Sequence, residues 1–305
     1  MPSVQSHLLR FVLRRIKIFG DEGTSIQGVR RRVESSARWL RTPRKVSVQP
    51  VQAGDVPAEW LIPQGAPADR VLLYFHGGGF AFCSLNTHRL MVSQLAIASG
   101  VRALSVDYRL APEHPFPAAL EDCLAAYHWL LQNGISPRKT VVAGDSAGGN
   151  LALVLMLALR DAGGPLPAAA VGISPVTDLA GTGESLRTKA GVDPILSAPV
   201  PVDIITSYVG EHDPRQPLIS PLYADLRGLP PILLHVGEDE KLLDDSTRLA
   251  ERASAAGVDA TVVVWPHMWH VFQAFAPFLP EARKSIGQIG NYVGESTSRG
   301  RGDGF

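Results

Sequence analysis

Short apolar runs alternate along this chain with segments in which apolar residues recur every three to four positions. Such alternation predicts strands joined by crossover helices, and therefore an α/β fold with a mostly parallel central sheet. The later runs are apolar throughout, as expected of strands buried on both faces. We predict eight strands, over Val46–Val51, Trp60–Ile62, Val71–Phe75, Ala103–Val106, Thr140–Ala143, Ala169–Ile173, Ile232–Val236 and Thr261–Val264.

Helical periodicity fills most of the gaps between these strands. It predicts helices over Arg89–Ser99, Ala118–Gln132, Gly149–Arg160, Asp244–Ala256 and Glu281–Tyr292. Two regions break the rhythm. Residues 182–224 are rich in Pro, Gly and Asp without a clear strand, which predicts a cap insertion, and residues 294–305 are dominated by Ser, Arg and Gly, which predicts a disordered tail.

The first 45 residues differ from the rest in charge. They hold 11 Lys/Arg against three Asp/Glu, which leaves 18 against 26 in the remainder. Arginines interrupt the apolar pattern here, so a secretory signal peptide is excluded. The favoured interpretation is that residues 1–45 form cap helices packed on their own domain, and a basic helix lying on lipid is the alternative. The apolar residues at helical spacing are Leu8, Leu9, Val12, Leu13, Ile16 and Phe19.

Composition narrows the classes of protein. A chain of 305 residues that is 45% hydrophobic and 19% charged can bury the core of one sizeable domain. Its net charge of zero argues against nucleic-acid binding. No apolar run reaches the roughly 18 residues needed to span a bilayer, so we expect a soluble, cytoplasmic protein without stable membrane insertion. Cys83 and Cys123 are too few for a disulfide framework or a zinc site and are expected to be reduced thiols.

A G-x-S-x-G pattern, Gly144-Asp-Ser146-Ala-Gly148, lies between a predicted strand and a predicted helix. A serine at such a tight turn has a strained backbone, its hydroxyl stands clear of the sheet, and glycines beside it prevent collisions. The helix N-terminus there favours a developing negative charge. Ser146 is therefore a candidate nucleophile, although the pattern by itself fits a serine that caps a helix equally well.

The strand predicted at 71–75 runs directly into His76-Gly77-Gly78-Gly79-Phe80. Three consecutive glycines are costly in entropy, and the N–H groups of such a turn can converge on one point and stabilise an oxyanion. We predict an oxyanion hole formed by Gly77, Gly78, Gly79 and the N–H of Ala147, with His76 orienting the turn. A flexible loop or a phosphate cradle is the alternative, but the chain has no Walker lysine and no G-x-G-x-x-G leading into a helix.

With these two motifs, the segment from Asp107 to Pro117 (DYRLAPEHPFP) resembles the hormone-sensitive-lipase-like esterases, the bacterial family IV carboxylesterases of the α/β-hydrolase fold. The resemblance covers residues 45–292. It implies hydrolysis of carboxylic esters through a covalent acyl-enzyme, without a metal or cofactor. It also implies a catalytic core formed by residues 46–181 and 225–293, under a helical cap formed by the N-terminus and the insertion at 182–224.

In this fold the acid and then the histidine follow the serine along the chain, which leaves four candidate bases, His212, His235, His267 and His270. His212 falls in the predicted cap insertion and His235 within a buried strand. His267 and His270 both follow the last predicted strand. The resemblance favours His270, because the family's histidine precedes a hydrophobic and an aromatic residue, as in His270-Val-Phe272. No H-E-x-x-H helix supports an H-x-x-H metal pair.

The acid must be chosen among five carboxylates after the penultimate strand, Glu238, Asp239, Glu240, Asp244 and Asp245. Family members read D-x-L-x-D here with the first acid catalytic. The segment from Glu240 to Asp244 keeps that spacing, and Glu240 precedes His270 by 30 residues. We therefore predict Glu240, with Asp239 in reserve, since either carboxylate can hold the histidine tautomer. Asp244 and Asp245 are expected to be first-turn helix charges.

The sequence leaves the substrate open beyond a small-molecule ester. The resemblance favours short acyl chains or compact cyclic esters, including lactones. An amidase or N-acetyl hydrolase would use the same triad, whereas a non-catalytic ligand-binding protein of this fold would lack it. A homodimer is left open. The apolar candidates for lining the pocket are Trp39, Leu40, Phe80, Phe82, Tyr208 and Trp269.

Overall fold

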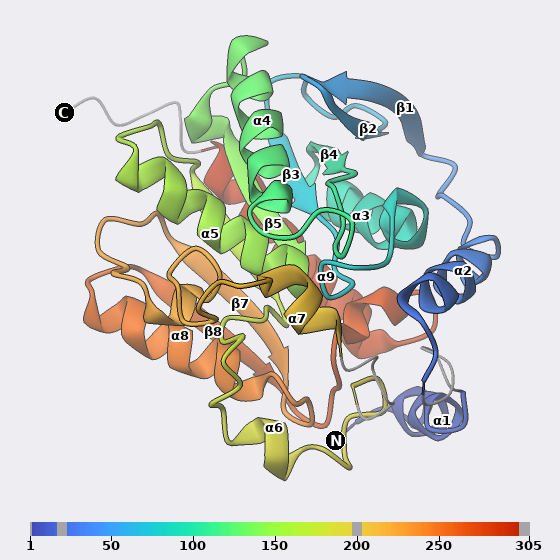
Figure 1. Cartoon of the computed structure of the whole chain (residues 1–305). Coiled ribbons are helices and arrows are strands. Elements are labelled where there is room, and N and C mark those ends of the chain that lie inside the picture. The colour runs from blue at the N-terminus through green and yellow to red at the C-terminus, as the bar shows by residue number, and fades with distance from the viewer. Residues whose placement is uncertain (1, 17–22, 197–202, 299–305) are drawn as a thin grey trace.

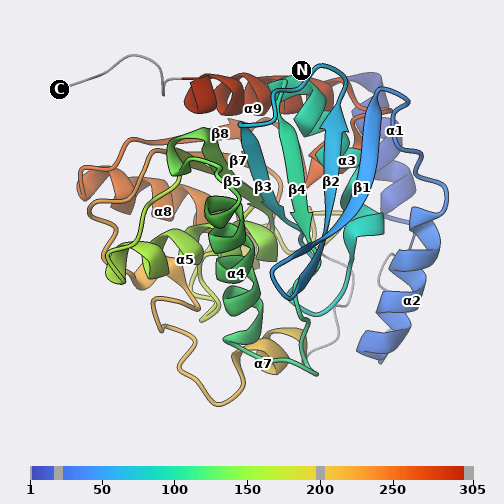
Figure 2. The same ribbon diagram turned by 90° about the horizontal axis from the view of Figure 1, so that it is seen from above.

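The computed structural model describes residues 2–16, 23–196 and 203–298. At its centre is an eight-stranded sheet in the order β1-β2-β4-β3-β5-β6-β7-β8 (Figures 1 and 2). The pairs β1–β2 and β2–β4 are antiparallel, and all the others are parallel. All eight predicted strands are present, at β1 Val46–Ala53, β2 Val56–Pro63, β3 Val71–Phe75, β4 Arg102–Val106, β5 Thr140–Asp145, β6 Ala169–Ile173, β7 Ile232–Gly237 and β8 Ala260–Trp265.

Helices cover both faces of the sheet (Figure 2). On one face lie α3 (Leu85–Ser99) and α9 (Pro280–Ser298), and on the other lie α4 (Ala118–Gln132), α5 (Ala147–Asp161) and α8 (Leu243–Ala255). Alternate residues of β3 enter the two resulting cores, with Leu73 and Phe75 on the α5 side and Leu72 and Tyr74 on the α9 side. Burial on both faces explains the continuously apolar strands of the sequence.

The C-terminal helix α9 is longer than predicted. Residues 294–298, which we expected to belong to a disordered tail, form its last turn, and residues 299–305 lie outside the described residues. The helix runs on because it packs closely against α3: a Cβ on Gly290 would lie 2.5 Å from the Cβ of Ala98. Thr297 is buried and donates its hydroxyl to the carbonyl of Val293. Close packing therefore overrides a composition typical of disorder.

Two helices precede the sheet, α1 (Val4–Leu13) and α2 (Ile26–Ala37), and both lie along one side of the molecule (Figures 1 and 2). In α1, Leu13 is buried and Leu9 packs partly against the core. The other predicted apolar positions are not packed: Leu8, Val12 and Ile16 are exposed, and Phe19 lies outside the described residues. The prediction of a helix packed on its own domain therefore holds for only one face of α1.

The segment 182–224 contains the helices α6 (Ser185–Thr188) and α7 (Asp203–Val209) and the short 3₁₀ turn η2 (Pro221–Tyr223). Two further 3₁₀ turns, η1 (Pro137–Lys139) and η3 (Phe272–Phe275), precede β5 and α9. Ile204 of α7 packs in a small buried cluster with Val29 of α2 and with Phe82. The N-terminal helices and the 182–224 segment thus meet above the strand ends. None of the helices within the described ranges is both long enough and apolar enough to cross a bilayer.

Candidate active site

Ser146 stands at the turn between β5 and α5 with φ 51° and ψ −118°, a backbone conformation that is strained for a residue with a side chain. The turn is tight because the backbone of β3 passes close to it. A Cβ on Gly148 would lie 1.9 Å from the carbonyl oxygen of Phe75, and one on Gly144 would lie 2.2 Å from Gly148. Only glycine fits at these two positions, which is the steric role that the motif predicted.

Three of the predicted side chains form one continuous line of contacts. Ser146 Oγ lies 3.1 Å from His270 Nε2, and His270 Nδ1 lies 2.9 Å from Glu240 Oε2. Ser174 Oγ donates to the other oxygen of Glu240 at 2.9 Å, and the N–H of Gly237 donates to the same oxygen. With Nδ1–H donated to the carboxylate, Nε2 is left free to accept the hydroxyl proton of Ser146.

Burial and mutual contact set the charges of this pair. Burial raises the pKa of the Glu240 carboxyl, and its contact with His270 opposes that effect. Burial lowers the pKa of His270, but the hydrogen bond and negative charge of Glu240 outweigh burial, so the pKa of His270 is raised above 6.5. The imidazole is therefore a stronger base than an ordinary histidine.

Asp239, the alternative candidate for the acid, faces Arg10 rather than His270. Asp239 Oδ2 accepts a hydrogen bond from Arg10 at 2.8 Å and does not contact His270. Asp244 and Asp245 lie in the first turn of α8, as predicted. Their carboxylates accept N–H groups from the segments beside them, Asp244 from Ser185 and Asp245 from Thr177.

The other candidate histidines lie away from the serine. His267 is exposed and lies near Asp239. His235 is buried on β7, where its Nδ1 contacts Ser285 Oγ at 2.8 Å, and burial lowers its pKa to about 4. His212 packs edge-on against Phe116 at a centroid distance of 5.1 Å.

Gly77, one of the four predicted oxyanion donors, is not available for that role. The N–H of Gly77 donates to Asp145 Oδ1 at 3.0 Å, so Gly77 has no free N–H for an oxyanion. The N–H groups of Gly78, Gly79 and Ala147 donate to no other group within the described ranges. Gly78 and Gly79 have φ of 115° and 58°, a left-handed backbone that glycine adopts without strain. These three N–H groups remain as candidate oxyanion donors.

Asp145 is a functional candidate that the sequence did not identify. Its buried carboxylate accepts the hydroxyl of Tyr74 at 2.7 Å as well as the N–H of Gly77, and it lies 3.2 Å from His88 Nε2. Burial raises its pKa, but the charge of His88 and these hydrogen bonds outweigh burial and lower it. Asp145 therefore ties the glycine turn to the turn that carries Ser146. Its position next to Ser146 in the sequence was the available signal.

His76 orients the glycine turn, as expected. Its Nδ1 lies 2.7 Å from the carbonyl oxygen of Gly77, and its ring stacks on Tyr108 at 4.4 Å. Burial lowers the pKa of His76 to about 4, which keeps the ring neutral.

The sequence analysis also missed Ser174, which donates to Glu240. Ser174 follows the end of β6 as Ser146 follows the end of β5.

Two arginines attach the N-terminal helices to the two sides of this site. Arg10 of α1 donates to the Asp239 carboxylate, to the carbonyl of His267 and, at 3.2 Å, to that of Val192. Arg30 of α2 donates to the carbonyl of Ala81 at 2.7 Å, just beyond the glycine turn. It also forms a bidentate pair with Glu113 of the DYRLAPE motif.

A mostly apolar cavity of about 540 Å³ opens beside Ser146 and His270. Of the six apolar residues predicted to line it, Phe80 and Phe82 do so, and Tyr208 stacks on Phe80 at 3.7 Å. Trp39 is 86% exposed on the surface, Leu40 is exposed and Trp269 is buried in the core, and none of the three lines the cavity. The aliphatic lining residues are Val33, Val176, Leu179, Leu186, Ile195, Leu196, Ile204, Ile205, Leu242 and Val271.

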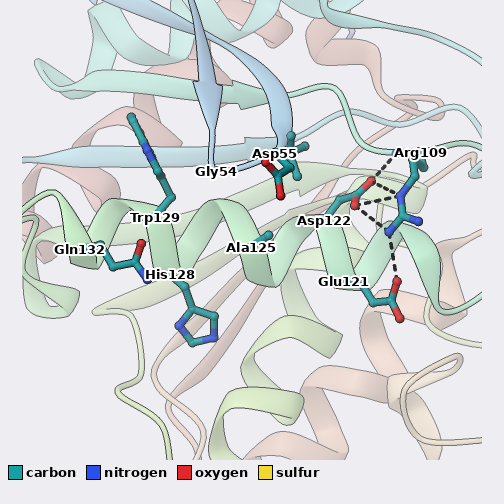
Figure 3. Close-up of a pocket in the computed structure, with 10 residues that line it drawn as sticks. Gly54, Asp55, Arg109, Glu121, Asp122, Ala125, His128, Trp129 and Gln132 are labelled. Carbon is teal, nitrogen blue, oxygen red and sulfur yellow. Dashed lines mark hydrogen bonds and ion pairs between the residues drawn. The ribbon is translucent and has the colours of Figure 1, made fainter.

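A second hollow, of about 500 Å³, lies between the β1–β2 turn and α4 (Figure 3). Arg109 lies at one end of the hollow and pairs with Asp122 and Glu121. The hollow shares no lining residue with the cavity beside Ser146 and contains no serine or cysteine. It offers no nucleophile for the chemistry that the first cavity supports.

One group of side chains has the residue types of a metal site, Glu238, Asp239 and His267. Arg10 binds Asp239 directly, and the Lys189 ammonium lies 3.9 Å from the same carboxylate. Glu238 accepts the backbone N–H of His267 at 2.9 Å. The protein's own cations and N–H groups therefore already partner these carboxylates.

Comparison with known proteins gives consistent matches. A family described as alpha/beta hydrolase fold matches residues 72–274. The chain is 44% identical over 250 residues to an acetyl-hydrolase of Streptomyces hygroscopicus, across 82% of this chain and 83% of that protein. It is 39% identical over 249 residues to an esterase of Acinetobacter venetianus, across 81% and 82%. A solved esterase from the bacterial hormone-sensitive lipase family has a TM-score of 0.91 at 43% identity, across 97% and 99%.

Proposed function

Because this chain belongs to the hormone-sensitive-lipase-like esterases of the α/β-hydrolase fold, we propose that it hydrolyses short-acyl or compact esters, including lactones, through Ser146, His270 and Glu240. One observation carries the proposal: the unbroken line of contacts from Ser146 Oγ through His270 to the buried Glu240 carboxylate, beside an apolar cavity. The acetyl-hydrolase among the relatives supports small acyl groups.

The reaction proceeds in two acyl transfers. His270 Nε2 takes the proton of Ser146 as Oγ bonds to the ester carbonyl carbon, and the carbonyl oxygen becomes an oxyanion held by the N–H groups of Gly78, Gly79 and Ala147. The protonated imidazole then gives its proton to the leaving oxygen, the carbon–oxygen bond breaks and the alcohol departs. Water repeats the sequence on the acyl-enzyme and releases the acid. Glu240 stabilises the imidazolium without taking its proton.

The helix α7, in the predicted cap insertion, limits the size of the substrate that the cavity can hold. Ile204 of α7 presses on the glycine turn, since a Cβ on Gly79 would lie 2.6 Å from Ile204 Cγ2. Ile204 itself is 2% exposed. Space beside the oxyanion donors is therefore limited by an aliphatic wall, which suits a short acyl chain or a small ring better than an extended one.

The test is a series of p-nitrophenyl esters from acetate to dodecanoate, with a lactone panel and the matching p-nitroanilides. We expect kcat/KM to be highest for acetate to hexanoate, and the anilides to react far more slowly. Faster cleavage of anilides would favour an amidase, and a maximum at dodecanoate would contradict the compact pocket. An organophosphate adduct found by mass spectrometry on a residue other than Ser146 would refute the nucleophile.

A further inference from the structure

The outward face of α1 carries an apolar stripe that nothing in the described chain covers. Val4, Leu8, Phe11 and Val12 are 81%, 65%, 55% and 39% exposed. They recur three or four positions apart and therefore share one side of the helix. Leu13, on the opposite side, already packs α1 on the core, so the outward stripe is not needed for folding.

Exposed cations that form no ion pair with a described residue lie at the end of α1, at Arg14 and Arg15, and recur along α2 and after it. Trp39, just after α2, is 86% exposed and stands between Arg38 and Arg41. Figures 1 and 2 place α1 and α2 along the same side of the molecule. Among the residues described between 2 and 45, the exposed cations that form no ion pair are Arg14, Arg15, Arg31, Arg32, Arg38, Arg41, Arg44 and Lys45.

We propose that this lipid-facing surface, defined as the outward side of α1 with Arg38–Arg41, binds an anionic bilayer. The charge and shape of this surface indicate which partner it binds. An excess of exposed cations without ion-pair partners in the described part of the chain favours an anionic partner, and exposed Phe11 and Trp39 among arginines are typical of helices that lie in a lipid interface. The exposed apolar side chains project outward from the helix. A fluid bilayer can surround such side chains, whereas a folded protein would need matching pockets.

The helix α2, which ends just before Arg38–Arg41, also reaches the ester site. Val33 of α2 lines the cavity beside Ser146, and so do Leu186 of α6 and Ile204 of α7. Docking through α1 would therefore hold the cavity near the membrane, where apolar esters concentrate. This consequence rests on the proposed esterase function, whereas the binding itself does not.

The test measures sedimentation of the Ser146→Ala protein with vesicles, so that lipid hydrolysis cannot interfere. Vesicles of phosphatidylcholine containing one third phosphatidylglycerol are compared with pure phosphatidylcholine, at about 0.05 M and about 0.5 M salt. We expect binding to the anionic vesicles that weakens at high salt. The Leu8→Ser/Phe11→Ser change in this protein should lower the partition coefficient at least about tenfold.

Phe278→Ser is the matched control, because Phe278 is also 68% exposed but lies in the loop before α9. It should leave binding unchanged. The Leu8→Ser/Phe11→Ser change in the otherwise wild-type enzyme should leave turnover of p-nitrophenyl butyrate unchanged. This result would distinguish loss of vesicle binding from loss of the proposed esterase activity. Absence of binding at low salt would overturn the proposal, as would an equal loss in the Phe278 variant. Analytical ultracentrifugation showing a dimer that only the α1 double variant dissociates would assign the face to a second copy instead.

Discussion

The guanidinium of Arg10 lies 2.8 Å from the carboxylate of Asp239, although 229 residues separate them in the chain. The same guanidinium binds the carbonyl of His267 and lies 5.4 Å from the ring of Trp269. Asp239 precedes Glu240 and Trp269 precedes His270. One side chain of the N-terminal helix therefore fixes the two loops that carry the proposed acid and base.

We expect Arg10→Ala to lower kcat about tenfold with little change in KM, because small displacements of the acid and base loops misalign the proton transfer. Asp239→Ala should also lower kcat, and the double variant should be little worse than Arg10→Ala, since all three variants remove the Arg10–Asp239 ion pair. Arg187→Ala, at an exposed ion pair with Glu184, is the control. Fully additive losses in the double-mutant cycle would show that Arg10 and Asp239 act independently.

The choice of acid is tested by Glu240→Gln against Asp239→Asn. Glutamine cannot stabilise the imidazolium, so we expect kcat/KM to fall on the order of 10⁴-fold. Asp239→Asn should fall less than about tenfold, because its carboxylate faces Arg10 rather than His270. Both proteins are compared by ester turnover at equal folded concentration. A larger loss in the Asp239 variant would transfer the role to that residue.

The pH profile should report the raised pKa of His270. Only the neutral imidazole accepts the proton of Ser146, so activity is lost as pH falls through that pKa. We expect the acidic limb of kcat/KM to have its inflection above 6.5. In Glu240→Gln the carboxylate charge is gone and burial dominates, so the inflection should move to lower pH. An inflection at the same pH in both proteins would contradict the assigned coupling.

Gly77→Ala tests the contact between the glycine turn and the turn that carries Ser146. The added Cβ would lie 2.2 Å from Asp145 Oδ2, so it must push the carboxylate off the Gly77 N–H. We expect a loss of about 1–3 kcal/mol of unfolding free energy, together with reduced kcat as the oxyanion donors shift. Gly287→Ala, where a Cβ meets nothing within 4 Å, is the control and should be neutral or slightly stabilising. Urea denaturation and ester turnover measure the two effects.

Ile204→Ala should widen the cavity beside the glycine turn. We expect the ratio of kcat/KM for p-nitrophenyl octanoate to that for the butyrate to rise about tenfold, because one aliphatic wall is shortened. Val264→Ala, a similar truncation at a 40% exposed position of β8, should leave the ratio unchanged. An unchanged ratio in Ile204→Ala would show that another residue limits the acyl chain.

The positions of the strands and the tight turn at Ser146 could be predicted from local signals in the sequence, whereas the choice of His270 among four histidines depends on the family resemblance. A strand buried on both faces is continuously apolar, and a nucleophile turn needs glycines close to its serine. Composition was a weaker guide, as α9 shows: the Ser, Arg and Gly content of residues 294–305 predicted disorder, yet packing on α3 continues the helix to Ser298.

Other features were decided only by the tertiary structure. Glu240 and Asp239 are adjacent carboxylates on one loop, and they differ because Arg10, far away in sequence, occupies one of them. The N–H of Gly77 is lost to Asp145 for the same kind of reason. Periodicity and motif spacing determine which residues reach the edge of the sheet. The partner that each polar group finds there depends on contacts between distant segments, which no local pattern encodes.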